Sequence, residues 1–386
     1  MRDVYFDHAA TTGVDPRVLE KMLPFLGDEY GNPSEMHRRG RVARAAVDEA
    51  RAQLAAVLGA DEREIVFTGG GSESDTLALV GFAQTQEPAH LVVSAVEHPA
   101  VVEAARYLQK RVGWDVSVAP VDAGGRVDVD AYAAAFRPDT KIAAVMLANN
   151  VVGTLQPIAE LARIAHEHGA VFHSDAVQAV GAVPVDVREL DVDLLALSGH
   201  KLYGPKGVGA LYVRRGVKLR PVIHGGGQER GLRSGTENVP GIVGIGEAAH
   251  LAVESMPTEA PRQAALRDRL IDGVLATIDE VGLLGARAGR LPGNACFTIR
   301  YIEGESMVLK LDAFGIAVSS GSACASTSLE PSHVIIAMGY DPVAAHGSLR
   351  LTLGRENTSE DVDYFLEVFP GVVGQLRAMS PLYTKG

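Results

Sequence analysis

Residues 170–201 read AVFHSDAVQAVGAVPVDVRELDVDLLALSGHK, and this stretch decides the fold. It contains two short apolar runs, Ala170–Ser174 and Asp193–Ser198, each followed by polar residues. Runs of this length are typical of strands that are buried on both faces of a parallel sheet. Ligands of such sheets bind beyond the carboxyl ends of the strands, which is where Asp175 and Lys201 fall.

The same alternation of strand and helix extends outward from this stretch. Apolar runs predict strands at residues 65–68, 91–95, 116–121, 142–147 and 208–213. Stretches with helical spacing predict helices at residues 40–58, 72–85, 100–111 and 157–168. Strands that alternate with helices indicate an α/β layer fold with a mainly parallel sheet.

The pattern changes near residue 256, which predicts a second domain. The segment MPTEAP at 256–261 reads as a boundary, and it precedes a predicted helix at 262–278, a strand at 294–301 and helices at 305–314 and 360–368. A chain of 386 residues is also too long for one ordinary domain. We therefore assign 15–255 to a large domain, and 1–14 with 256–386 to a smaller α+β domain.

Composition limits the cellular compartments and the classes of binding partner that we expect for this protein. A net charge of −12 argues against direct binding to nucleic acid or to an anionic membrane surface. The N-terminus, MRDVYFDHAATT, lacks the apolar core of a secretory signal, and no apolar stretch is long enough to span a bilayer. Cys296 and Cys324 lack the spacing of a zinc or disulfide framework. We expect a soluble cytoplasmic protein without a metal site.

Two glycine-rich segments are candidates for phosphate binding. Gly69–Ser72 lies between a predicted strand and a predicted helix, where backbone N–H groups bind anions. Ser72 and Asp75 also fit a capping box, so an ordinary helix start explains the segment equally well. The second segment, Gly225–Thr236, reads either as a phosphate loop or as a flexible connection.

Asp175 follows the predicted strand Ala170–Ser174, and Gln178 lies three residues further on. A carboxylate at that position can pair with a pyridinium nitrogen and keep it protonated. Gln178 can hydrogen-bond the phenolic oxygen of the same ring. Taken alone, Asp175 fits a helix N-cap better.

The segment Ser198-Gly199-His200-Lys201 lies at the carboxyl end of the predicted strand Asp193–Ser198. A lysine at the end of an apolar strand can be desolvated, which lowers the pKa of its amine and makes it nucleophilic. Ser198 and His200 are candidate phosphate ligands. The alternative is a surface lysine, but the continuation YGPKG at 203–207 makes the motif more specific than a lone Lys201.

Three further polar residues each have two interpretations. His98 can stack on a flat cofactor ring and move protons, or it can be structural. Asn150 can hydrogen-bond a substrate carboxylate or a ring oxygen, or it can serve a turn. Arg350 lies in an apolar run and can clamp a carboxylate through two N–H groups, or it can form a structural ion pair.

The two cysteines differ in their surroundings. Cys324 lies in SSGSACASTS, residues 319–328, and these small residues favour a reactive thiol, because a structural cysteine prefers apolar burial. Cys296 lies in the run Ala295–Thr298 and reads as a buried strand residue.

Together these motifs resemble the NifS/IscS-type cysteine desulfurases of the class V aminotransferase group. The resemblance covers nearly the whole chain. In chain order it is carried by YFDHAATT (5–12), GNPS (31–34), residues 67–75, EH (97–98), HSDAVQ (173–178), SGHKLYGPKG (198–207), RSGT (233–236), SGSAC (320–324) and LGR (353–355). It implies fold type I of the pyridoxal 5'-phosphate (PLP) enzymes, with a large domain built on a mainly parallel seven-stranded sheet and a smaller α+β domain.

The resemblance also implies how PLP is bound. Lys201 would form a Schiff base with it, His98 would stack on its ring, and Asp175 and Gln178 would bind the ring nitrogen and the phenolic oxygen. Asn150 is a further candidate contact to the ring. The phosphate ligands implied by the resemblance are Gly71, Ser72, Ser198, His200 and, from the partner subunit of a homodimer, Thr236.

The implied reaction converts L-cysteine to L-alanine. Asn150 and Arg350 would orient the substrate carboxylate, Lys201 would remove the Cα proton, and Cys324 would take the sulfur as a persulfide. By resemblance, the acceptor of that sulfur is an iron–sulfur scaffold protein. The alternatives are a selenocysteine lyase or an aminotransferase on the same scaffold, a sulfur donor for tRNA or DNA thiolation, or a sulfur-relay partner with a decayed PLP site.

One position departs from the family pattern. Relatives often read Asn-Asn-Glu where this chain reads Asn149-Asn150-Val151. The resemblance therefore does not carry over a polar contact from an acid at Val151.

Overall fold

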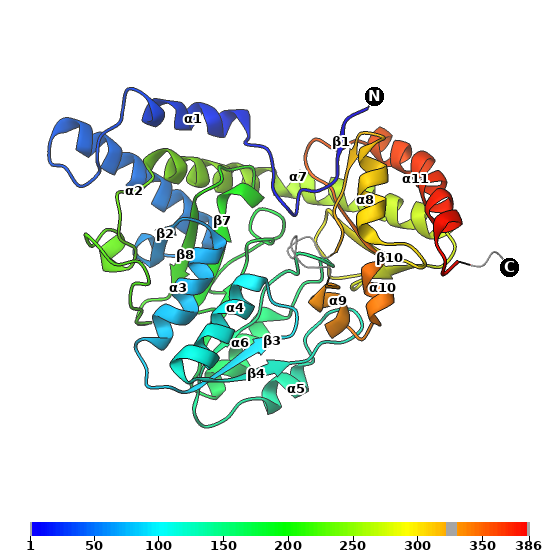
Figure 1. Ribbon diagram of the computed structural model, residues 1–386. Coiled ribbons are helices and arrows are strands. Elements are labelled where there is room, and N and C mark those ends of the chain that lie inside the picture. Colours follow the sequence, from blue (N-terminus) through cyan, green and yellow to red (C-terminus); the bar gives the residue numbers. More distant parts are fainter. Residues whose placement is uncertain (1, 322–329, 384–386) are drawn as a thin grey trace.

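A central sheet of seven strands dominates the protein in a computed structural model that describes residues 2–321 and 330–383 (Figure 1). The strand order is β2-β8-β7-β6-β5-β3-β4. β8 runs antiparallel to both of its neighbours, and every other neighbouring pair is parallel. The predicted mainly parallel seven-stranded sheet is confirmed. Its strands are β2 (Ile65–Thr68), β3 (His90–Ser94), β4 (Asp115–Ala119), β5 (Thr140–Ala144), β6 (Val171–Asp175), β7 (Leu194–Ser198) and β8 (Gly209–Val213).

Helices cover both faces of this sheet, because successive side chains of a strand point to opposite faces. Leu91 and Val93 of β3 pack in the core under α3 (Gly71–Ala83) and α4 (Pro99–Tyr107). Val92 belongs to the core on the other face, which α2 (Arg38–Leu58) and α6 (Ile158–Glu167) also build. Burial on both faces explains why these strands read as continuous apolar runs.

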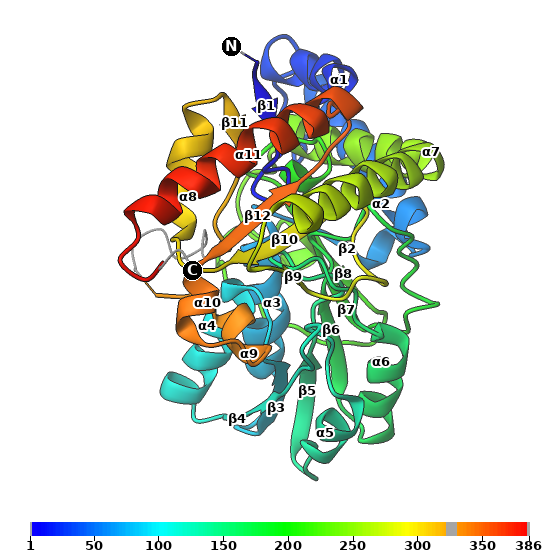
Figure 2. The ribbon, with the colours of Figure 1, turned by 90° about the vertical axis from the view of Figure 1, so that its right-hand side faces the viewer.

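The two ends of the chain build a separate core around the second sheet, whose strands β9, β10 and β12 are labelled in Figure 2. That sheet is antiparallel, with the order β12-β10-β9. β1, near the N-terminus, pairs in parallel with β11 in the C-terminal part, so Val4 and Phe6 belong to this core. The elements are β1 (Val4–Tyr5), β9 (Val281–Leu284), β10 (Asn294–Ile299), β11 (Ile316–Ala317), β12 (Ser348–Thr352), α8 (Gly304–Asp312), α9 (His333–Ala337), α10 (Pro342–His346) and α11 (Ser359–Met379).

The helix α7 (Val239–Thr277) connects the two cores without interruption. Its first half packs in the core of the large sheet, and its second half packs in the core of the small one. The predicted start of a helix at residue 262 is therefore wrong, since Pro257 and Pro261 lie inside α7. A proline costs the helix one backbone hydrogen bond, and packing along both halves outweighs that cost. The domain division at 255/256 remains a proposal, which the two separate cores support.

Two helices were not predicted from the sequence. α1 (Pro16–Leu26) was missed although Asp15 at its N-cap and Pro16 at its first position are helix-start signals. α5 (Val129–Ala134) has only six residues, too few to show a periodic pattern, and α4 continues through one π-helical turn, Leu108–Val112. Within the described residues, no helix has the length and apolarity needed to cross a membrane.

Candidate active site

A cavity of about 320 Å³ opens at the carboxyl ends of the central strands. The segments that follow β2, β6 and β7 meet there, as the topology of a parallel sheet requires. The predicted site residues that line it are Gly71, Ser72, His98, Asn150, Asp175, Gln178, Ser198, His200, Lys201 and Arg350. Five lining residues had no predicted role: Ala9, Ala10, Asp75, Met146 and Val177.

One end of the cavity has the character of an anion site. Gly71 is the first residue of α3, and Ser72 lies in the first turn of this helix, where N–H groups are free to bind an anion. A Cβ on Gly71 would lie 2.7 Å from Val177 Cγ2, so any larger residue would force the Val177 side chain or the backbone to shift. The predicted capping box is wrong, because Gly70 is the N-cap and Ser72 already has helical geometry. The Ser72 hydroxyl is thereby available to the cavity.

Lys201 ends a 3-10 turn that directly follows β7. Its Nζ donates to the carbonyl oxygens of Ala9 and Ala10 at 2.5 and 2.7 Å. Gln178 Nε2 donates to the same Ala9 oxygen at 2.9 Å. The N-terminal segment therefore fixes the amine at the wall of the cavity, a contact between residues about 190 positions apart that no local pattern could reveal.

Asp175 is the last residue of β6 and is 4% exposed. Its Oδ1 accepts a hydrogen bond from Val177 N at 2.8 Å. One ligand atom from each of Asp75, His98 and Asp175 lies within 4.8 Å of the others, a spacing that could also hold a metal ion. Burial and the charge of Asp175 raise the pKa of Asp75 well above its usual value, which weakens this group as a cation site.

His98 is the N-cap of α4, and its Nδ1 accepts from Ala100 N at 3.1 Å. This bond orients the ring at the cavity wall and leaves Nε2 to carry the proton of the neutral form. Burial lowers the pKa of His98, an effect that the charge of Asp175 opposes and that of Lys201 reinforces. The ring is therefore neutral near pH 7, which suits stacking on a flat cofactor.

His200 lies next to Lys201, and its Nδ1 is 3.1 Å from Thr11 Oγ1. Burial, followed by the charges of Lys201 and Lys206, lowers the pKa of His200 to about 4. The ring therefore contributes hydrogen bonds to an anion and no charge.

Arg350 occupies the middle of β12, and its side chain is 4% exposed. Nη1 donates to the Asn150 carbonyl at 3.0 Å, and Nη2 donates to Asp7 Oδ1 at 2.8 Å. The ion-pair interpretation of Arg350 is confirmed, and its role as a carboxylate clamp stays a prediction for a side chain that lines the cavity. The partner Asp7 was missed, since it lies 343 residues away in the chain.

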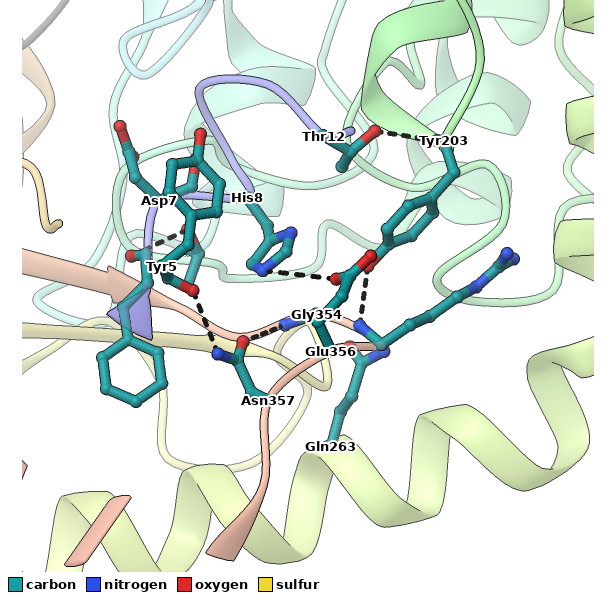
Figure 3. A network of polar contacts seen from close by, with 12 residues as sticks. Tyr5, Asp7, His8, Thr12, Tyr203, Gln263, Gly354, Glu356 and Asn357 are labelled. Carbon is teal, nitrogen blue, oxygen red and sulfur yellow. Dashed lines mark hydrogen bonds and ion pairs between the residues drawn. The ribbon is translucent and has the colours of Figure 1, made fainter. Parts of the chain in front are cut away.

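A polar network anchors the N-terminal segment between the two halves of the protein (Figure 3). Asn357 Nδ2 donates to the Tyr5 carbonyl at 3.0 Å, and Tyr203 N donates to Thr12 Oγ1 at 2.9 Å. Between these points His8 Nε2 lies 3.8 Å from Glu356 Oε2. Residues 5–12 are therefore held at both ends, which keeps the Ala9 and Ala10 carbonyls at Lys201.

Cys324 lies outside the described residues, but the segments on both sides of its loop are described. Ser319 exchanges two backbone hydrogen bonds with Arg350, at 2.7 and 3.1 Å. On the other side, His333 Nε2 donates to the Glu97 carbonyl at 3.0 Å, one residue before His98. One flank of the loop is thus bonded to Arg350, which lines the cavity, and the other flank is bonded to Glu97, which precedes the lining residue His98.

Cys296 is fully buried in β10, as predicted. Burial raises the pKa of this thiol to about 12, so Cys296 stays protonated and unreactive at neutral pH.

Comparison with known proteins identifies the family. The sequence matches Aminotransferase class-V over residues 4–365. The chain belongs to this family. It is 52% identical to a "Cysteine desulfurase" of Gluconacetobacter diazotrophicus, with 99% of this chain and 96% of that protein covered. It is 50% identical to a "Cysteine desulfurase IscS" of Dictyoglomus turgidum, with 98% and 97% covered. The solved structure of a NifS-like protein superposes with a TM-score of 0.91 at 39% identity, covering 97% of this chain and 100% of that one.

The cavity of this member of the class V family fits PLP, the cofactor of the family. If Lys201 bound the aldehyde of PLP, the N-terminus of α3 with Gly71 and Ser72, which lines the same cavity, could bind the phosphate of PLP. It would also have the buried carboxylate of Asp175 for a protonated ring nitrogen. The donors and acceptors of the cavity are therefore those that PLP requires.

Two positions with a counterpart in the family pattern, Thr236 and Val151, do not line the cavity. Thr236 is exposed and does not line the cavity of its own chain, so its role toward a partner subunit stays a prediction. Val151, where the family often has Glu, is buried in an apolar cluster with Val96 and Ile335. A carboxylate there would lose hydration among these side chains, which explains why valine is accommodated in this chain.

Proposed function

We propose that this protein is a PLP-dependent cysteine desulfurase that converts L-cysteine to L-alanine and passes the sulfur to an acceptor. One observation carries the proposal. The amine of Lys201, the carboxylate of Asp175 and the guanidinium of Arg350 line one cavity, and the residues flanking the Cys324 loop are bonded beside it.

Different side chains of the cavity bind the substrate and transfer its protons. Arg350 and Asn150 bind the α-carboxylate, because a guanidinium pairs with a carboxylate through two N–H groups. The Nζ of Lys201 takes the proton from Cα and later returns a proton to the product. When bound, PLP supplies the electron sink that makes this proton removable, and Asp175 keeps its ring nitrogen protonated.

Cys324 performs the sulfur transfer. Its thiolate attacks the sulfur of the substrate, so a S–S bond forms as the Cβ–S bond breaks and the bond electrons stay on the carbon. Protons taken up at Cβ and Cα complete alanine, and Cys324 is left as a persulfide. A thiol or an acceptor protein then removes the terminal sulfur and restores the thiol.

The proposal includes a homodimer. Thr236 is exposed, which agrees with a contact across a subunit boundary. The N-terminal helix α1 and the loop after it also present large apolar side chains to solvent, and surfaces of this kind mark contact sites. They are Leu19, Leu23, Leu26, Tyr30 and Met36, the last two being 70% and 88% exposed.

We further propose an iron–sulfur scaffold protein as the acceptor and the cytoplasm as the compartment. The name IscS, which relatives of 48–50% identity carry, supports the first point. A persulfide that must be formed and discharged repeatedly requires a reducing compartment, which supports the second.

The test mixes purified protein with PLP, L-cysteine and a thiol reductant. Sulfide and alanine should form in equal amounts, whereas formation of 3-mercaptopyruvate, with the sulfur retained, when a keto acid is added as amino acceptor would indicate an aminotransferase. Cys324→Ala should abolish sulfide release, and Cys296→Ala is the matched control that should retain it. Full sulfide output from Cys324→Ala would refute the assigned nucleophile.

A second measurement tests the Schiff base. Borohydride should reduce the wild-type protein to a stable PLP adduct that loses the visible absorbance of the imine. Lys201→Ala should yield no protein-bound adduct, although it can still bind PLP. An adduct at another lysine of Lys201→Ala would contradict the assignment.

A further inference from the structure

The ion pair between Asp7 and Arg350 bears on how tightly the site binds amino acids. Asp7 Oδ1 accepts from Nη2 at 2.8 Å, and Asp7 is the only carboxylate within 4 Å of this guanidinium among residues 2–321 and 330–383. A buried cation without a counter-charge is strongly destabilising. Asp7 therefore neutralises Arg350 when no substrate is present.

Arg350 keeps hydrogen-bonding capacity beyond this pair. A guanidinium has five N–H donors, of which one donates to the Asn150 carbonyl and another to Asp7 Oδ1. Nη1 and Nη2 each carry a second N–H, and Arg350 lines the cavity. A substrate carboxylate can therefore approach Arg350 from the cavity while Asp7 stays bound to it.

We propose that Asp7 is the resident counter-ion of Arg350 and that its charge sets the affinity of the cavity for an α-carboxylate. This inference rests on the proposed function, in which Arg350 binds the carboxylate of the substrate. A bound carboxylate must share one guanidinium with Asp7, and two like charges at one cation repel each other. Asp7 therefore weakens the binding of L-cysteine and of L-alanine alike, so that the product leaves the site more readily.

The backbone around Asp7 is fixed independently of its side chain. Asp7 forms a parallel bridge with Thr352, two residues beyond Arg350 on β12. Thr352 N donates to the Phe6 carbonyl at 2.7 Å, and the Tyr5 hydroxyl donates to the Asp7 carbonyl at 3.0 Å. A substitution that changes only the Asp7 side chain therefore leaves these contacts in place.

Asp7→Asn tests the charge, because asparagine has the same size and keeps an acceptor oxygen. The dissociation constant of L-alanine, measured by calorimetry on the PLP-loaded protein, should fall about tenfold, since relief of like-charge repulsion is on that scale. KM for L-cysteine should fall by a similar factor, with kcat within about twofold. Without ligand the variant should melt at a lower temperature than the wild type. L-alanine should raise the Tm of the variant by more than it raises the Tm of the wild type.

Two comparisons make the test specific. Asp272→Asn breaks an exposed pair with Arg287, 2.7 Å long, and should leave alanine binding unchanged. In an Arg350→Gln background, Asp7→Asn should no longer tighten alanine binding, because the two residues act through one contact. Asp7→Ser, a second neutral variant, should tighten binding as Asp7→Asn does.

An unchanged or weaker affinity for L-alanine in both neutral variants would overturn the proposal. So would an equal tightening in the Arg350→Gln background. Alanine binding requires no turnover, so its outcome is separable from the proposed activity. A protein that passes this test and makes no sulfide from L-cysteine would refute the desulfurase function and leave the role of Asp7 standing.

Discussion

Asp75 Oδ1 lies 3.0 Å from His173 Nε2, and both side chains are completely buried next to Asp175. Burial, then the charge of Asp175, raises the pKa of Asp75 well above its usual value, and burial lowers the pKa of His173 to about 4. Both shifts favour the neutral forms, so the Asp75 carboxyl group donates its proton to Nε2. Asp175 is then the only charged member of the trio, as its proposed role toward a pyridinium nitrogen requires.

This neutral pair predicts different outcomes for two substitutions of Asp75. Asp75→Asn should cost less than about 1 kcal/mol of unfolding free energy, because its amide N–H also donates to Nε2. Asp75→Ala leaves Nε2 buried without a donor and should cost about 1–3 kcal/mol or more. Urea unfolding at pH 7 measures both. Equal losses in the two variants would mean that the native pair is ionic.

Glu97 predicts how stability depends on pH. It is fully buried, and burial raises the pKa of its carboxyl group to about 8 from an ordinary value of 4.5. Between these values the folded state holds a proton that the unfolded state has lost, so this group makes stability fall as pH rises until about 8. Glu97→Gln cannot titrate and should show a flatter decline of Tm from pH 5 to 8. The exposed Glu103→Gln is the control and should follow the wild type.

Asp175→Asn should slow sulfide release by about 100-fold or more, the range that an acid–base group contributes. The reason is that an amide does not keep the ring nitrogen of PLP protonated, so the Cα proton becomes harder to remove. Asp191→Asn, which changes a half-exposed carboxylate bound to Arg214, should keep the wild-type rate. A normal rate in Asp175→Asn would remove Asp175 from the proposed set.

Gly71→Ala should weaken the affinity for PLP by about tenfold or more, because its methyl group would crowd Val177 at the expected phosphate position. Gly374→Ala is the matched control in a helix, since a Cβ on Gly374 meets nothing within 4 Å. It should leave PLP binding unchanged and stabilise the protein by about 0.5–1 kcal/mol. Equilibrium titration of the apoprotein with PLP, followed by absorbance, distinguishes the two variants.

The sequence by itself determined the central sheet and most residues of the cavity. Strands buried on both faces are apolar along most of their length, so β3, β6 and β7 could be predicted from short apolar runs in the sequence. The carboxyl ends of parallel strands lie at one edge, so the residues that follow them, such as Asp175 and Lys201, were predictable as neighbours. Motif order along the chain then identified the family.

Tertiary structure alone decided the contacts that join distant segments. Asp7 meets Arg350, and the Ala9 and Ala10 carbonyls meet Lys201, because residues 4–7 join the C-terminal core through β1–β11 pairing and a bridge to β12. The continuity of α7 across Pro257 and Pro261 is of the same kind. Such outcomes depend on packing between segments far apart in sequence, which no local pattern records. The sequence therefore predicted Lys201 and Arg350 as functional residues. Only the fold showed that backbone carbonyls of the N-terminal segment bind the first and that Asp7 is the counter-ion of the second.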